Sequence, residues 1–270
     1  KNRLSTLDDG DNYGYARNIL LKIAPSQINI GELNLGKAGF SYKDRFIQGK
    51  FTSLDRFDEV EFNRNYNTSS QTQSQDESLR EIGLLLQPLN EITLNSSAGF
   101  LRKGDNFSSD RFNNTIRFSD MKSFNVEYNL DLVNSKTSIL KSDWLRHKGN
   151  AYYSFWLLKP GFDFLAEDKQ DKQTTKDSLL NGSLKYFEYS PYIELVEISG
   201  FKALTRFSLR DDHLPINGIM IKESRSKTYS FELNYSGIRE VNSNFVLTFR
   251  NKKYQEQLKE KGFLDNETIL

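Results

Sequence analysis

The only two histidines of the chain, His147 and His213, mark the places where proton-transfer chemistry could occur. Asp211-Asp212-His213 places two carboxylates beside one imidazole, a combination that can act as a general acid and base. That chemistry would also need a second pair of carboxylates facing this group, and the sequence does not place one. Because both histidines fall in polar stretches that we interpret as exposed loops, we predict no catalytic residues and no enzymatic activity.

A second candidate is an oxygen-rich stretch near the beginning of the sequence, Asp8-Asp9-Gly10-Asp11-Asn12. Its carboxylate and amide oxygens are ligands that Ca²⁺ prefers, but the stretch lacks the spacing and the terminal glutamate of an EF-hand loop. We therefore interpret it as a turn and predict no metal site.

The densest mixture of charged and aromatic residues lies between Asp55 and Tyr66. As a recognition loop it would bind through large and charged side chains, which are common at interfaces. Its contact residues would be Arg56, Arg64 and Tyr66. As a strand it would turn three apolar side chains inward: Phe57, Val60 and Phe62. We favour the strand, with its charges in water.

Other features of the sequence exclude whole classes of function. The chain contains no cysteine, which excludes thiol catalysis, thiolate metal sites and a disulfide scaffold. It has no glycine-rich phosphate loop, no Gly-x-Ser-x-Gly and no His-Glu-x-x-His motif, and we expect no cofactor. Lysine plus arginine number 37 against 36 aspartate plus glutamate, so there is no electrostatic basis for binding nucleic acid.

The elements that would position any site follow from a two-residue alternation of apolar and polar residues. Side chains of a β-strand point alternately to its two faces, so this pattern predicts amphipathic strands and not helices. It is clearest from Thr115 to Leu132. One face there carries Phe124, Val126, Tyr128, Leu130 and Leu132, and the other carries Asn125, Glu127, Asn129 and Asp131.

We predict five hairpins between residues 81 and 250. Their turns are expected at 88–90, Asp120 to Ser123, Lys159-Pro160-Gly161, near Ser190-Pro191 and Ser236 to Glu240. Four polar stretches between hairpins are interpreted as long loops: 103–110, 134–150, 167–178 and 210–227. Short turns and long loops would then lie on opposite sides of an all-β, antiparallel up-and-down meander.

The chain divides by pattern into a β-rich N-terminal segment with a polar linker, residues 1–75, and the hairpin array, residues 76–270. In the first part we expect strands at Ile19 to Ile23 and at Ile28 to Leu35, separated by Pro25. Residue 1 is lysine, so we expect the chain to be a mature or internal piece of a longer product.

The fifth hairpin has the pattern of a membrane-crossing strand pair. Its first strand turns Tyr229, Phe231, Leu233 and Tyr235 to one face, so that aromatic residues bracket an apolar centre. The return strand turns Phe245, Leu247 and Phe249 to that face. In this pattern of strands and turns, residues 80–254 resemble large outer-membrane β-barrel proteins of Gram-negative bacteria, in particular those of the Bacteroidetes type. The resemblance is architectural and implies no functional residues. The chain ends without the terminal aromatic residue typical of such barrels, so we expect that either the barrel is partial or more chain follows.

Two functions are therefore kept open. The first is a non-enzymatic outer-membrane barrel, or part of one, with a transport, assembly or structural role; its partners would be the lipid bilayer and other proteins of the cell envelope. The second is a soluble extracellular or periplasmic β-sandwich that acts as a structural or binding module. The sandwich is favoured by a mean hydropathy of −0.65, by charges at Glu188, Glu194 and Glu197, and by the run Phe155 to Leu158, which is apolar at every position.

Overall fold

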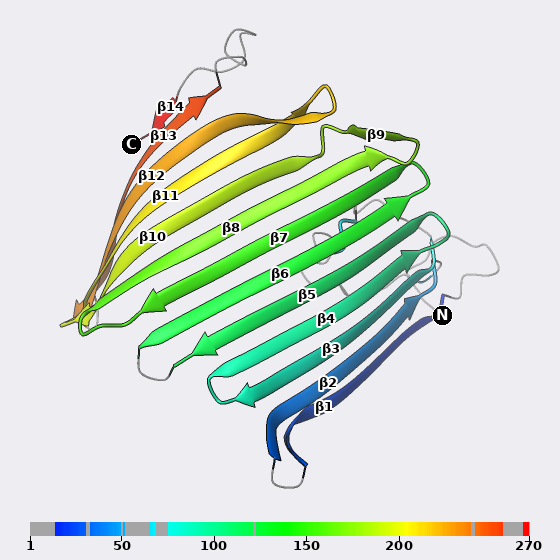
Figure 1. The fold of residues 1–270 in the computed structure, drawn as a ribbon, viewed down its shortest axis with the longest axis horizontal. Helices are drawn as coiled ribbons and strands as arrows, with labels where there is room; N and C mark the ends of the chain where they lie inside the picture. Colours follow the sequence, from blue (N-terminus) through cyan, green and yellow to red (C-terminus); the bar gives the residue numbers. More distant parts are fainter. Residues whose placement is uncertain are drawn as a thin grey trace.

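The computed structural model describes residues 14–30, 33–49, 51, 65–68, 75–120, 123–238, 241–255 and 267–269. Nearly all of these residues belong to one sheet of antiparallel strands that follow each other in chain order (Figure 1). The short strand β9 is a branch that pairs with β8. The strands are β1 Ala16–Ile30, β2 Leu33–Ile47, β3 Glu77–Leu89, β4 Ile92–Lys103, β5 Phe107–Ser119, β6 Phe124–Thr137, β7 Leu140–Tyr153, β8 Leu158–Gln173, β9 Lys176–Leu179, β10 Leu184–Ile198, β11 Phe201–Ile216, β12 Ile219–Ile238, β13 Val241–Tyr254 and β14 Glu267–Ile269. The predicted all-β, antiparallel up-and-down meander is confirmed.

Short connections follow β1, β3, β5, β7, β10 and β12, and all of them lie at one edge of the sheet, the turn edge (Figure 1). Three of these turns lie where the sequence predicts them, near residues 90, 120–123 and 236–240. Two predicted turns are wrong, because Lys159-Pro160-Gly161 lies within β8 and Ser190-Pro191 lies within β10. The turns that replace them are at 154–157 and at Ser199-Gly200.

Pro191 is accommodated inside β10 by a local change in pairing. Proline has no N–H to donate to a neighbouring strand. The pairing of β10 with β11 passes from Tyr189 to Tyr192 without a partner at Pro191, while the pairing with β8 continues through it. A hydrogen bond of 2.7 Å between the hydroxyl groups of Ser190 and Ser208 joins β10 to β11 at this point.

The four polar stretches predicted as long loops are mostly strand, so this prediction is wrong in its detail. Residues 103–110, 134–150 and 210–227 contain tight turns at 104–106, 138–139 and 217–218, and otherwise continue the paired strands. The stretch 167–178 is the end of β8 with a branch to β9. Polarity on both faces does not indicate a loop here, because the backbone groups pair between strands whatever the side chains are.

The first two strands belong to the same sheet, since β2 pairs with β3 along its length. Pro25 does not separate two strands, as the sequence predicts, but lies within β1 at a shift of register between Ile23 and Ser26. Proline is compatible with such an irregularity on an outer strand of a sheet.

Among the described residues, few apolar side chains are buried. One compact cluster consists of Tyr66, Leu79 and Leu101, with Phe107 packed against it. Tyr66 belongs to residues 65–68, one of the described parts of the β2–β3 connection, which we call the Tyr66 segment. The other large apolar side chains of the described strands are mostly exposed or half-exposed on the sheet. The fold is therefore held by continuous backbone pairing and by contacts between neighbouring strands.

The turn at Ser199-Gly200 tests how strictly the meander depends on its tight turns. Both residues have positive φ, 49° and 84°, as in the turns that match the twist of hairpin strands. A β-carbon at Gly200 would lie 2.3 Å from the backbone of Gly237. Replacing Gly200 with alanine should lower the free energy of unfolding in urea by about 1–3 kcal/mol.

Ser199→Asn provides the control for this substitution. Asparagine tolerates positive φ, so this variant should unfold within about 0.5 kcal/mol of the original protein. Equal stabilities of the two variants would contradict the turn geometry.

Candidate functional site: the two faces of the sheet

Cross-strand partners share a face of the sheet, so the register of the ladders decides which side chains lie together. One row crosses six neighbouring strands on one face: Ile116, Tyr128, Gly149, Phe164, Tyr189 and Leu209. These partners confirm the alternation read from residues 115–132. The pairing of Phe231 with Leu247 and of Leu233 with Phe245 confirms that of the fifth hairpin. We call the side that carries this row the apolar face and the opposite side the polar face.

The apolar face has a constant height. On five adjacent strands its mainly apolar stretch is nine residues long: Phe124–Leu132, Leu145–Tyr153, Leu158–Ala166, Phe187–Leu195 and Phe201–Leu209. Many of its side chains are about half exposed, such as Ile116 at 48% and Ile193 at 53%. Toward the edge opposite the turns, the next side chain on the same face is polar or charged: Asn134, Asp143, Asp168, Lys185 and Asp211.

Aromatic residues gather where this face meets the turn edge. The rings of Phe118 and Phe124 lie 6.1 Å apart, and those of Phe201 and Tyr235 lie 4.4 Å apart. Trp156, at positive φ, is 83% exposed in the β7–β8 turn. The run Phe155 to Leu158 is therefore largely turn, joined by one isolated bridge. Reading it as a strand buried on both faces, as in a sandwich, is wrong.

Polar groups on the apolar face are bonded to each other. The Ser96 hydroxyl donates to Asn114 Oδ1 over 2.6 Å between β4 and β5. The Tyr128 hydroxyl lies 2.6 Å from His147 Nδ1 between β6 and β7. His147 is thus a strand residue and not, as the sequence predicts, a loop residue. Such pairing lowers the cost of placing polar groups where no water is available.

The polar face carries rows of ion pairs. Asp131 accepts hydrogen bonds from Arg111 over 2.9 Å and from Arg146 over 2.5 Å, and its side chain is only 9% exposed. Glu77 pairs with Arg45 and, over 3.1 Å, with Lys103. Each of these carboxylates therefore has two cationic partners, which stabilise its charge.

Two glutamates that seemed to break the alternation belong to the same polar face. Glu188 lies opposite Leu165 and Arg210, and Glu194 lies opposite Lys159, to which it pairs over 3.5 Å. The third, Glu197, lies beside the turn at Ser199. Glu188 and Glu194 share one phase of the strand and leave the apolar face uninterrupted, whereas Glu197, three residues after Glu194, does not share that phase.

Asp211-Asp212-His213 forms part of β11 and not of a loop. Because neighbours in a strand point to opposite faces, Asp212 and His213 do not face each other. Asp211 pairs with Arg225 over 2.7 Å and with Lys222 over 2.9 Å, and Asp212 accepts a hydrogen bond from Arg210 over 2.7 Å. Both carboxylates therefore serve in ion pairs between or within strands.

The other predicted candidates lie mostly outside the described residues. Asp8-Asp9-Gly10-Asp11-Asn12 lies outside them completely, as do Arg56, Arg64 and the predicted strand residues Phe57, Val60 and Phe62. Tyr66 is described and is buried against the polar face, 2% exposed. Sequence reasoning missed its partner, Gly99, although a glycine within a strand is a signal of close approach by another part of the chain.

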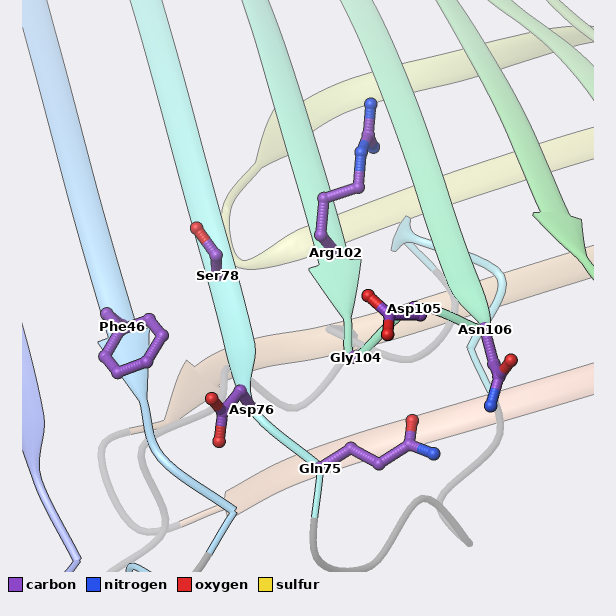
Figure 2. Close-up of a pocket in the computed structure, with 8 residues that line it drawn as sticks. All are labelled: Phe46, Gln75, Asp76, Ser78, Arg102, Gly104, Asp105 and Asn106. Atoms are coloured by element: carbon purple, nitrogen blue, oxygen red, sulfur yellow. The ribbon is translucent and has the colours of Figure 1, made fainter.

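Among the hollows on the described part of the sheet, two large ones are lined mainly by polar side chains. One, of about 540 Å³, lies beside the tight turn at 104–106, at the edge of the sheet opposite the turn edge (Figure 2). It is lined by side chains such as Phe46, Asp76 and Arg102, but Arg102 already pairs with Asp110 over 2.6 Å. The other, of about 490 Å³, lies over β6–β11 beside Glu127, Lys148 and Glu188. Both hollows are open and polar.

Within the described ranges, no three histidine, aspartate or glutamate side chains are arranged to hold a metal ion. The described part of the chain also has no helix long and apolar enough to cross a bilayer. No protein-family model matches the sequence, and neither a curated protein nor a solved structure matches the chain.

The Arg111–Asp131–Arg146 group gives a test of the polar face. Replacing Asp131 with asparagine removes the charge that separates two arginines, so the free energy of unfolding in urea should fall by about 2–4 kcal/mol.

Glu127→Gln is the matched control on the same face. Glu127 pairs with Arg117, but both side chains are about half exposed, at 45% and 59%. Its loss should therefore cost less than about 1 kcal/mol. If Asp131→Asn were no more destabilising than this control, the ion pairs would not organise the polar face.

Proposed function

We propose that the chain forms part of the wall of an outer-membrane β-barrel, with its apolar face against lipid and its polar face toward a water-filled interior. The observation that carries this proposal is the nine-residue height of the apolar face on five adjacent strands. A tilted strand needs about 9–11 residues to cross the hydrocarbon layer of a bilayer. A constant height is expected of a face against lipid, whereas a face covered by protein follows the shape of its partner.

The borders of the apolar face support the same orientation. Aromatic residues mark its limit at the turn edge, where the amphipathic rings of Trp156 and Tyr235 would meet the polar headgroups. At the other limit, charges begin on the same face, and ion pairs such as Lys185–Asp168, at 3.1 Å, link neighbouring strands. The paired strands then continue beyond this limit, as they would in water outside the membrane.

The outermost strands of the sheet limit how this wall can stand in a membrane. Among the described residues, no ladder joins β1 to β13 or β14. Unpaired N–H and C=O groups cost several kcal/mol each in hydrocarbon. In a membrane, the outermost strands would therefore pair with each other or with further strands.

The role that fits this wall is transport, assembly or support, and not catalysis. The carboxylates Glu77, Asp131 and Glu194 each pair with cations and offer no free acid or base. Paired charges of both signs suit a wet interior that hydrophilic molecules can enter. The bilayer is then the principal partner, and other proteins of the cell envelope are further ones.

A soluble extracellular or periplasmic module is the second candidate. It is favoured by the low mean hydropathy of −0.65 and by the absence of closure among the described strands. In that case, a protein partner would cover the apolar face.

Solubility and gel migration separate the two candidates. A membrane wall should need detergent and should migrate differently before and after heating, because folded barrels resist unfolding by detergent at room temperature. Free solubility at high concentration without detergent would contradict the proposal.

A pair of neighbouring substitutions on β13 gives a sharper test. Leu247 is 53% exposed on the apolar face, opposite Phe231, and Thr248 lies on the polar face, opposite Ser230. In lipid vesicles, Leu247→Arg should lower the free energy of unfolding by about 2–4 kcal/mol, because it places a charge in hydrocarbon. Thr248→Arg should change it by less than about 0.5 kcal/mol, as expected of a water-exposed position.

A sheet surrounded by water would give a different result. Arginine at the half-exposed position 247 would then cost no more than arginine at position 248. Equal effects of the two substitutions would therefore argue against lipid on the apolar face.

A further inference from the structure

The aromatic ring of Tyr66 packs the Tyr66 segment against the polar face. Tyr66 packs against Leu79 and Leu101, which are 1% and 0% exposed. These two leucines belong to β3 and β4 and point to the polar face, because they share a row with Arg45 and Ser109. Apolar residues interrupt the polar pattern at the place that the segment covers, so the sheet is built to receive it.

Gly99 provides the space for this contact. A β-carbon at this position would lie 2.2 Å from the Tyr66 hydroxyl oxygen, too close for any other residue without displacement of the ring. Glycine in the middle of a strand weakens the strand. The close approach of Tyr66 explains why a glycine stands at position 99.

Two hydrogen bonds fix the segment to different strands. The Tyr66 hydroxyl donates to Glu81 Oε1 over 2.6 Å, and Asn67 Nδ2 donates to Ser135 Oγ over 2.8 Å. Asn67 has a positive φ of 49°, a conformation that asparagine tolerates. The segment therefore spans the polar face from β3 to β6.

The hydroxyl group of Tyr66 keeps its proton. Burial and the nearby charge of Glu81 raise the pKa of Tyr66 above its ordinary value, so the group remains a donor at physiological pH. Glu81 also pairs with Lys43 over 3.1 Å. The hydrogen bond between Tyr66 and Glu81 is thus connected to the ion pairs of the polar face.

We propose that the Tyr66 segment is a fixed constriction inside the barrel, which narrows the wet interior over β3–β6 and limits the passage of small hydrophilic solutes. This inference rests on the proposed function, because the polar face must enclose water for the segment to narrow it. Solutes that pass would be forced beside the charged row of Arg111, Asp131 and Arg146, which adjoins the segment at Ser135.

The position of the segment can be tested by engineered disulfides, since the chain has no native cysteine. The pair Asn67→Cys with Ser135→Cys should cross-link on oxidation in detergent. The control pair, Asn67→Cys with Ser208→Cys, joins the segment to β11 on the same face and should not. Equal cross-linking of the two pairs, or none in either, would overturn the proposed position.

The constriction itself can be tested by single-channel conductance in planar phosphatidylcholine bilayers with potassium chloride. Gly99→Val should displace Tyr66, and Tyr66→Ser should remove the anchor without a clash. Both should raise the conductance about two-fold or more, because conductance follows pore width. Tyr66→Phe keeps the ring in its apolar site and should conduct much as the original protein does.

These measurements test the constriction separately from the proposed membrane wall. If Gly99→Val and Tyr66→Ser insert and show heat-dependent migration but conduct as the original protein does, the constriction is wrong while the wall stands. If the original protein is silent and these two variants conduct, the segment closes the interior completely. A protein that neither needs detergent nor shows heat-dependent migration would instead contradict the wall.

Discussion

The register of the cross-strand ladders is the constraint on which the rest of the structure depends. Because side chains alternate, a slip of one residue in any ladder would move a whole strand's apolar side chains to the polar face. Tight turns hold this register at the ends of the strands, for example Ser199-Gly200 with both φ values positive. The ion pairs hold it from the polar side, since Asp131 reaches Arg111 on β5 and Arg146 on β7 only in this alignment.

The two faces of the sheet contribute to the stability of the fold in different ways. A soluble domain of this size would bury its apolar residues in a core, but here the described buried apolar residues form little more than the cluster around Leu79 and Leu101. The apolar face is available to a surrounding solvent such as lipid, and its few polar groups, such as Tyr128 and His147, bond to each other. The polar face instead satisfies its charges in pairs and holds the Tyr66 segment. We propose that these differences match an environment of lipid on one side and water on the other.

Local alternation was enough to predict the fold class, the strand phases near Phe124 and Tyr229, and three of the turns. It failed where a residue type or a polar stretch is compatible with both a turn or loop and a strand. Pro191 suggested a turn, but a missing hydrogen bond on one side of β10 accommodates it. The polar stretches suggested loops, yet strands that leave the apolar layer become polar on both faces. The site at Tyr66 could not be predicted, because its contacts with Glu81, Gly99 and Ser135 depend on how distant strands are placed side by side.

The most direct measurement is the accessibility of spin labels at single cysteines from Tyr229 to Tyr235 in lipid vesicles, which the cysteine-free chain allows. Labels at Tyr229, Phe231, Leu233 and Tyr235 should collide with dissolved oxygen, which concentrates in lipid, and little with a water-soluble nickel complex. Labels at Ser230, Glu232 and Asn234 should show the reverse. Equal access of the nickel complex to all seven positions would contradict lipid on one face and water on the other.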